Sequence, residues 1–389
     1  MAEYAEITRK EIRPGAAAGS YKRAGFERFD QKDNMLLRCN WDPDFKEGFS
    51  FQDQTNNRTE LMKRNAPGYG PLDWAMYMAT TANAAATNFE INTMDKGGLS
   101  WAPIARNPGG LEIRTGEFPK WDGDAVENTR IVKKIARLLG AADVGICEYD
   151  RSFIYSRYFD KARNESLPIC FDDEPGIDPV TAPTTLADGT KVIPAAMKYA
   201  IMLIFPMDPA GIMTAPVLTH SATTFLSYSQ ISFAVMGLAE FLRGLDFNAI
   251  PSSNELGQNI PLAIDAGLGE PTRNCKLAHP VYGSCCRIAK VLTDLPLIPD
   301  KPIEFGVREQ CKSCGVCAER CPVGAFSKEP DMSETPAGPF SHRNMLQWPA
   351  HHDKCRQHWV KVGTNCGICL AVCPLNKPFR QTPKEYWAK

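Results

Sequence analysis

The C-terminal part of the chain carries the run Cys311-Lys-Ser-Cys314-Gly-Val-Cys317-Ala-Glu-Arg-Cys321-Pro322. Its spacing, Cys-x2-Cys-x2-Cys-x3-Cys-Pro, is that of bacterial ferredoxins, in which the fourth cysteine binds the other of two [4Fe–4S] clusters. The short loops let three sulfur atoms converge on three irons of one cubane. The run therefore predicts a ferredoxin-like module at this end of the chain.

A second run, Cys366-Gly-Ile-Cys369-Leu-Ala-Val-Cys373-Pro374, lacks one partner, which Cys355 can supply from upstream. Two clusters need eight thiolates, and this region holds eight cysteines. Crossing the runs assigns Cys311, Cys314, Cys317 and Cys373 to one cluster, and Cys321, Cys355, Cys366 and Cys369 to the other. Structural zinc is the alternative, because Cys-x2-Cys pairs also bind zinc, but these runs do not divide into two pairs per site.

Composition narrows the function classes. The 389 residues include 44 Lys and Arg against 45 Asp and Glu, and a net charge of −1 argues against a nucleic-acid binder. Hydrophobic residues make up 43%, which is typical of a folded globular chain of two or three domains. No uninterrupted apolar run approaches the roughly 18 residues that span a bilayer. The start, Met1 to Tyr4, shows neither an apolar leader nor twin arginines, so we expect an intracellular chain or one whose signal has been removed.

Three regions are predicted from the pattern along the chain. Residues 1–125 are punctuated by Gly and Pro, which indicates a loop-rich covering region with a few short helices, one of them at Asp73–Asn88. Residues 126–305 form an α/β or α+β core, with an excursion near 148–197, and residues 306–389 form the cluster module. The core elements are expected to be a helix capped by Asn128 and stopped by Gly140, strands at 143–147 and 199–205, and a long helix over 221–245.

Two stretches upstream of the cysteines carry a more specific signal. They are Ala266-Gly-Leu-Gly-Glu-Pro-Thr-Arg273 and Thr293-Asp-Leu-Pro-Leu-Ile-Pro-Asp-Lys-Pro302. Together with the cluster runs they resemble the respiratory reductive dehalogenases, over about residues 125–380. The resemblance implies an α+β fold, in which a nitroreductase-like α/β core binds a base-off, cobalamin-type corrinoid and a bacterial-ferredoxin-like module holds two [4Fe–4S] clusters.

The resemblance also implies a catalytic set. Tyr228, Asn254 and Arg287 have the family's spacings, 26 and then 33 residues. Tyr228 would protonate the carbon that loses halide, because a guanidinium such as that of Arg287 stabilises the tyrosinate left behind. Asn254 and Arg287 would also hold the halogen or the departing halide. Taken singly, the three would be a core tyrosine, a turn residue and a surface charge.

Less specific predictions concern the cofactor and the substrate walls. The segment Thr272–Gly283 should line the corrinoid, although Asn274-Cys275 stands where the family commonly has Gly, and its predicted contacts are Thr272, Arg273, Lys276, Pro280, Tyr282 and Gly283. The family's pocket walls are aromatic, and the candidates are Trp359, Trp101 and Trp348.

The resemblance implies reductive removal of halide from a small organohalide, with a chlorinated aliphatic favoured, by a Co(I) corrinoid supplied through the two clusters. It implies a membrane anchor protein, an electron donor and no nucleic-acid partner, at the outer face of the cytoplasmic membrane after twin-arginine export. No oligomeric state is predicted. The alternatives are an enzyme similar to epoxyqueuosine reductase, which would use a carboxylate as acid, and a two-cluster electron carrier without a corrinoid.

Overall fold

The structure is a computed structural model that describes residues 12–87, 94–103 and 121–379. The N-terminal residues on which the export prediction depends, and Asn88 at the end of one predicted helix, lie outside the described residues. A four-stranded antiparallel sheet forms the centre, in the order β2-β7-β11-β8. Its strands are β2 (Asp143–Glu148), β7 (Tyr199–Pro206), β11 (Cys286–Thr293) and β8 (Ala249–Ser252).

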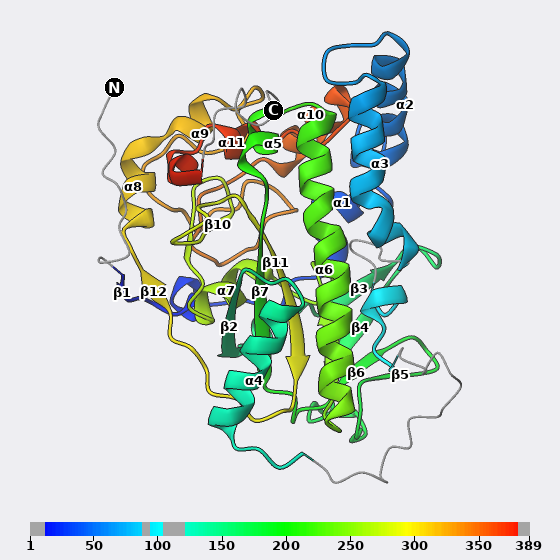
Figure 1. The fold of residues 1–389 in the computed structure, drawn as a ribbon, viewed down its shortest axis with the longest axis vertical. Coiled ribbons are helices and arrows are strands. Elements are labelled where there is room, and N and C mark those ends of the chain that lie inside the picture. The colour runs from blue at the N-terminus through cyan, green and yellow to red at the C-terminus, as the bar shows by residue number, and fades with distance from the viewer. Residues whose placement is uncertain (1–11, 88–93, 104–120, 380–389) are drawn as a thin grey trace.

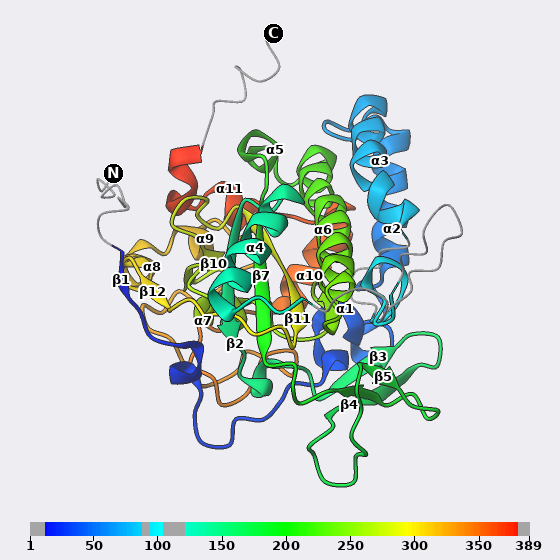
Figure 2. The same ribbon diagram turned by 60° about the horizontal axis from the view of Figure 1, so that its bottom comes forward.

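Helices cover both faces of this sheet (Figures 1 and 2). On one face, α6 (Leu218–Gly244) and α4 (Ala125–Leu138) pack against side chains such as Ile201, Leu203 and Val291. On the other face, α7 (Asn259–Asp265) packs against Met202 and Ile204. The apolar run that was predicted to be a buried strand is β7. Its residues are apolar without interruption because both faces of this strand lie in a hydrophobic core.

Helix α6 is the longest helix of the described chain, with 27 residues. It is the one described helix long and apolar enough to cross a membrane by length and composition, and half of its most apolar window is buried inside the protein. It lies between the central sheet and α3 (Pro71–Ala86). Its position is that of a core helix, and its middle turns face the cavity described below.

The predicted start of α4 is wrong by one turn. The N-terminal cap is Asp124, whose side chain accepts from the N–H groups of Val126 and Glu127. Asn128 is buried inside the helix, where its amide accepts from Trp121 Nε1 at 2.7 Å and donates to the carbonyl of Pro296 at 3.1 Å. Both residues are good caps in isolation, so the preference of the residue type did not distinguish them.

The N-terminal region is more helical than the Gly and Pro pattern predicts. Helices α2 (Phe51–Lys63) and α3 stand side by side, and α3 packs along α6. A capping box formed by Ser50 and Asp53 begins α2. The excursion is a second small sheet of order β3-β4-β6-β5, built from β3 (Arg157–Asp160), β4 (Glu165–Phe171), β6 (Lys191–Ile193) and β5 (Thr184–Thr185).

The cysteine-rich region folds as short helices and loops against the core. Its helices are α8 (Val307–Cys314), α9 (Val316–Glu319), α10 (His352–Val362) and α11 (Ile368–Ala371). Gly315 and Gly367 take the left-handed conformation between neighbouring cysteines, which turns the chain so that successive thiols face inward. Short pairings join distant segments: β1 (Arg13–Pro14) with β12 (Ile303–Glu304), and β9 (Glu270–Pro271) with β10 (Leu277–Ala278). The remaining helices are α1 (Met35–Arg38) and α5 (Pro209–Met213).

Candidate active site and cluster sites

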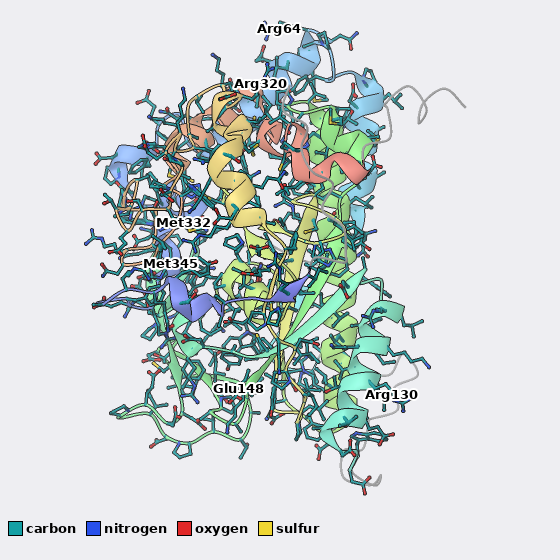
Figure 3. All side chains as sticks on the ribbon, turned by 90° about the vertical axis from the view of Figure 1, so that its left-hand side faces the viewer. Arg64, Arg130, Glu148, Arg320, Met332 and Met345 are labelled. Atoms are coloured by element: carbon teal, nitrogen blue, oxygen red, sulfur yellow. The ribbon has the colours of Figure 1, made fainter. Side chains whose placement is uncertain are left out.

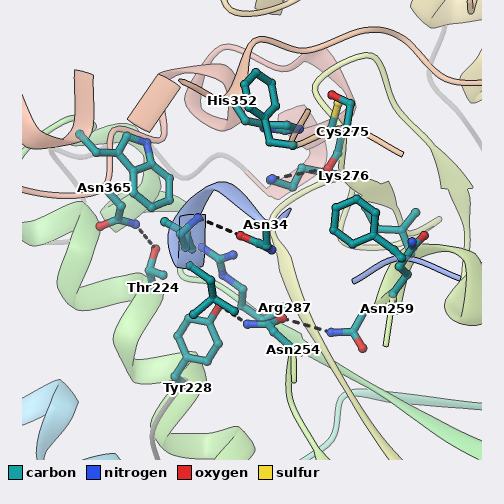
Figure 4. A pocket seen from close by; sticks show the side chains of 18 of the residues that line it. Asn34, Thr224, Tyr228, Asn254, Asn259, Cys275, Lys276, Arg287, His352 and Asn365 are labelled. Carbon is teal, nitrogen blue, oxygen red and sulfur yellow. Dashed lines mark hydrogen bonds between the residues drawn. The ribbon is translucent and has the colours of Figure 1, made fainter. Parts of the chain in front are cut away.

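A cavity of about 970 Å³ lies between α6, the N-terminal helices, the loop after β8 and the cysteine-rich module. Met332 and Met345, two of its lining residues, are labelled in Figure 3, and Figure 4 shows the polar part of its wall. This volume is at the upper end of the range for sites that hold drug-sized ligands. The cavity is therefore large enough for a bulky cofactor or for more than one small ligand.

Three of the predicted residues meet at one wall of this cavity. Tyr228 lies on α6, Asn254 in the loop after β8, and Arg287 at the start of β11 (Figure 4). Asn254 Nδ2 donates a hydrogen bond to the Tyr228 hydroxyl at 3.0 Å. The Arg287 guanidinium carbon is 5.4 Å from the centroid of the Tyr228 ring. The structure brings the three side chains together; their roles stay predictions.

Arg287 has unused hydrogen-bonding capacity. Its Nε is buried and has no hydrogen-bond partner in the described part of the chain. A buried donor without a partner costs free energy unless a ligand or water satisfies it. The charged residues that line the cavity are all basic, namely Arg58, Lys161, Lys276 and Arg287. This wall is suited to a ligand that carries negative charge or releases an anion.

The first predicted cysteine set surrounds a small cavity of its own. Cys311, Cys314, Cys317 and Cys373 all line it, although Cys373 comes from the second run. Burial raises the pKa of Cys311 to about 11, and Cys373 and Cys314 act in the same direction. Buried thiols of this kind become thiolates when a metal binds them. The four cysteines that line this cavity are those of the crossed pairing, and their binding of one cubane stays a prediction.

The other four cysteines form a second group. Burial raises the pKa of Cys355, Cys366 and Cys369 to about 12, and in each case Cys321 raises it further. These effects indicate that Cys321 lies near the other three, and Cys369 also interacts with Cys373 and Cys317 of the first set. The group combines Cys321 from the first run with three cysteines from downstream, again as the crossed pairing predicts.

The second cysteine group lies next to the large cavity. Cys275 lines the cavity and packs with Cys321 and Cys369 against one apolar cluster. Lys276, also in the cavity wall, lowers the pKa of Cys355 through its charge. Cys275 takes a left-handed backbone conformation with φ of 57°, the type of position where glycine is usual. The turn between β9 and β10 thus separates the second group from the cavity.

Only part of the predicted corrinoid segment faces the cavity. Thr272 and Lys276 line it, and Arg273, Pro280, Tyr282 and Gly283 do not. Tyr282 stacks on His279, with ring centroids 4.9 Å apart, and packs against the core. Gly283 lies against the backbone of Leu375. The hairpin lines the cavity through Pro271 and its turn, and the corrinoid contacts expected of Pro280, Tyr282 and Gly283 stay predictions.

Arg273 points away from the cavity, into the module. It is 1% exposed, and its guanidinium donates to the carbonyl of Cys311 through Nη2 at 2.7 Å and to that of Ser327 through Nη1 at 2.9 Å. It also lines the small cavity of the first cysteine set. Arg273 therefore lies outside the large cavity and holds the loop of Cys311, and its contact with the corrinoid stays a prediction.

The predicted aromatic walls are divided in the same way. Trp359 and Trp348 line the cavity, whereas Trp101 is buried in the core with Lys191 Nζ 4.8 Å from its ring centroid. Trp101 is therefore not a pocket wall. Sequence analysis missed Phe225 and Tyr77, which continue the aromatic wall with ring centroids 5.4 Å apart. Phe225 precedes Tyr228 by three residues, and this helical spacing is a signal that could have found it.

A buried polar group that begins one turn before Tyr228 on α6 was also missed. Asn365 Nδ2 donates to Thr224 Oγ1 at 3.0 Å, and Ser221 contacts both Asn365 and Thr364. These residues line the cavity and join α6 to the loop that carries Cys366. No motif marks them in the sequence, because their partners are more than a hundred residues away.

Comparison with known proteins places these features in a family context. The model of the "4Fe-4S double cluster binding domain" matches residues 310–376. The chain is 36% identical over 289 residues to tetrachloroethene reductive dehalogenase of Sulfurospirillum multivorans, covering 71% of this chain and 54% of that protein. It is 30% identical over 311 residues to trichloroethene reductive dehalogenase of Dehalococcoides mccartyi, covering 68% and 51%. The predicted resemblance to reductive dehalogenases is confirmed, and the chain spans about half the length of these relatives.

Solved structures agree on the fold. A catabolic reductive dehalogenase superimposes with a TM-score of 0.62 at 20% identity, covering 96% of this chain and 44% of that one. The predicted fold class, an α+β core with a two-cluster module, is thus confirmed. Epoxyqueuosine reductase of Bacillus subtilis is 34% identical over 115 residues, which cover 29% of this chain. The match to the dehalogenase of Sulfurospirillum multivorans covers 71% of this chain.

Proposed function

We propose that this chain is a reductive dehalogenase that removes halide from a small organohalide, with Tyr228 as the proton donor. The observation that carries the proposal is the meeting of Tyr228, Asn254 and Arg287 at one wall of a 970 Å³ cavity whose other wall adjoins a group of four cysteines. A chlorinated aliphatic is the proposed substrate class, because two relatives are named for tetrachloroethene and trichloroethene.

The cavity fits the cofactor that the family resemblance implies. Its volume and basic lining suit a large corrinoid, and Thr272 and Lys276 are the predicted residues that would contact it. A reduced corrinoid bound there would supply electrons to the carbon–halogen bond. The two cysteine groups would hold [4Fe–4S] clusters, and the second group is the one next to the cavity. Electrons would therefore enter through the first cluster and leave through the second.

The chain's own residues would supply the proton and hold the leaving group. When the Tyr228 hydroxyl gives its proton to the carbon, the Asn254 N–H and the nearby Arg287 charge stabilise the tyrosinate. The guanidinium of Arg287, which lines the cavity, would bind the halogen or the released halide. The aromatic wall formed by Phe225, Tyr77 and Trp359 would keep water from the reaction.

The competing functions require different acids and metals. An enzyme similar to epoxyqueuosine reductase would need a carboxylate where Tyr228 stands, and the charged lining residues are basic. A pure electron carrier would bind iron without a corrinoid. A membrane anchor, an electron donor and export to the outer face of the membrane remain part of the proposal and rest on the family resemblance alone.

The test combines metal content with one conservative variant. Anaerobically purified protein should contain one cobalt and about eight irons. Tyr228→Phe should abolish turnover of chlorinated ethenes and keep both metals, whereas the control Tyr199→Phe, at the end of β7 and outside the cavity lining, should keep activity. Eight irons without cobalt in reconstituted protein would favour the electron carrier, and turnover retained by Tyr228→Phe would remove the proposed role of that tyrosine.

A further inference from the structure

A lysine is buried beneath the candidate active site. Lys290 lies on β11 and its side chain has no solvent exposure. Its Nζ donates to Asn259 Oδ1 at 2.7 Å, and to the carbonyls of Ser253 and Gly257 at 3.2 Å each. All three acceptors belong to the segment that carries Asn254. A fully buried lysine requires compensating contacts of this kind, so its presence there calls for a reason.

These contacts fix the orientation of the Asn259 amide. A charged Lys290 ammonium has only donors, so the side-chain atom of Asn259 that faces it is then the oxygen. The other side-chain atom of Asn259 faces the carbonyl of Ser253 at 2.7 Å and that of Ile288 at 3.2 Å. Carbonyls only accept, so this atom must be the Nδ2 group. Donors and acceptors on both sides thus exclude the flipped amide.

The orientation passes from one amide to the next. Asn259 Nδ2 has two protons: the Ser253 carbonyl accepts one, and Asn254 Oδ1 and the Ile288 carbonyl, each at 3.2 Å, share the other. With its oxygen so engaged, Asn254 presents Nδ2 to the Tyr228 hydroxyl at 3.0 Å, and Figure 4 shows the two amides in line with that hydroxyl. The tyrosine oxygen is therefore an acceptor in this contact, and its own proton is not used by Asn254. A flipped Asn254 would instead accept that proton.

We propose that Lys290 and Asn259 are positioning residues that orient Asn254 and so keep the Tyr228 proton available to a ligand in the cavity. This inference rests on the proposed role of Tyr228 as proton donor. Asn259 lines the cavity, whereas Lys290 is on the side of the sheet opposite α6 and acts through Asn259 and through the loop carbonyls of Ser253 and Gly257. The chain Lys290–Asn259–Asn254–Tyr228 links both faces of the sheet.

The groups around Lys290 show that keeping a charged lysine at this position costs free energy. Burial lowers the pKa of Lys290 to about 7, and the buried carboxylate of Glu255 opposes that shift. Glu255 accepts from the N–H of Ser253 at 2.6 Å, so it is tied to the same loop. An apolar residue would fill the site without this cost.

Asn259→Asp tests the orientation directly. The new carboxylate would still accept from Lys290, but it could not donate to Asn254 Oδ1 or to the carbonyls of Ser253 and Ile288. Asn254 would then turn its Nδ2 towards the carboxylate and its oxygen towards Tyr228. The intensity ratio of the tyrosine Raman doublet distinguishes a hydroxyl that accepts from one that donates. The signal of Tyr228 is obtained from anaerobic holoenzyme as the difference from Tyr228→Phe.

We expect the Tyr228 signal to change from acceptor type to donor type in Asn259→Asp, and kcat to fall roughly ten- to a hundredfold with KM little changed. Lys290→Met, which releases the Asn259 amide, should give a mixture of the two types. The matched control is Ser253→Ala, which removes a buried hydroxyl without a partner in the described chain and keeps the carbonyl.

An acceptor-type signal retained in folded Asn259→Asp with full cobalt and iron would overturn the proposal, whatever the activity. Because the Raman signal does not require turnover, it also separates this inference from the proposed function. A protein that never dehalogenates can still show the expected change, and an active dehalogenase can fail to show it. If Lys290→Met does not fold, Asn259→Asp alone decides.

Discussion

Replacing Arg273 by lysine separates two interpretations of that residue. The sequence resemblance predicts a contact with the corrinoid, whereas the structure places the guanidinium among backbone carbonyls of the cluster module. Nε and Nη2 both donate to the carbonyl of Cys311, at 3.1 and 2.7 Å, and Nη1 donates to those of Ser327 and Glu329. The planar fork reaches these acceptors together, which one ammonium group cannot do.

The size of the effect follows from the carbonyls left unpaired. A buried acceptor without a partner costs about 1–3 kcal/mol, so losing two of the three costs about 2–6 kcal/mol. The lost cation–π contact of Arg273 with the Trp348 ring, at 5.4 Å, adds to this. Because Cys311 belongs to the first cysteine group, the loosened loop should release that cluster.

Metal analysis with electron paramagnetic resonance of the reduced protein is the assay. Arg273→Lys should lose about four of eight irons and the signal of one cluster, and it should retain cobalt. The exposed Arg320, in the same module, provides the matched control, and Arg320→Lys should keep all the metals. Loss of cobalt from Arg273→Lys with eight irons retained would refute the reasoning and restore the predicted corrinoid contact.

Three further predictions test other parts of the site. Cys373→Ser should remove the first cluster and Cys321→Ser the second, as read from which paramagnetic signal disappears; loss of the same signal from both would contradict the crossed pairing. Trp359→Ala should raise KM with little change in unfolding temperature, whereas Trp101→Ala should cost about 3–5 kcal/mol of stability and leave KM unchanged. The pKa of Lys290 is lowered to about 7 from 10.5, so the unfolded chain binds more protons than the folded chain between these pH values. In denaturant unfolding from pH 7 to 8.5, the free energy of unfolding of the wild type should rise by roughly 1–2 kcal/mol relative to that of Lys290→Met. A difference between the two proteins that is independent of pH would contradict this.

The features that sequence analysis predicted correctly are those with a local physical cause. Cysteine spacing restricts which thiols can meet, so the two runs by themselves indicate how the eight thiols divide into two groups. The apolar stretch at β7 and the long apolar pattern at α6 predicted buried elements because burial of both faces requires them. In contrast, α2 and α3 have weak periodicity, and they owe their stability to packing against α6 and α10.

The direction of a side chain within a loop could not be predicted in the same way. Thr272, Arg273 and Lys276 are neighbours in one turn, yet the first and last face the cavity while the arginine enters the module. The direction of Arg273 depends on carbonyls at residues 311, 327 and 329, which come close only in the folded chain. A family resemblance assigns the segment and does not assign each side chain.

The sequence itself shows that Lys290 is unusual, because a lysine stands inside an apolar strand, but it does not show what the lysine does. It stands inside Cys286-Arg-Ile-Ala-Lys-Val-Leu-Thr293, the last strand of the central sheet along the chain, where apolar residues surround it. A lysine is almost never fully buried unless it is paired, so this position alone implies partners. The sequence cannot say which, because Asn259 is an ordinary residue at the start of a short helix. Once the fold brings them to 2.7 Å, Lys290 on one side and the carbonyls of Ser253 and Ile288 on the other determine the direction of the Asn259 amide. Lys290 in the strand and Tyr228, the predicted proton donor on α6, are therefore the two ends of one hydrogen-bonded chain of side chains.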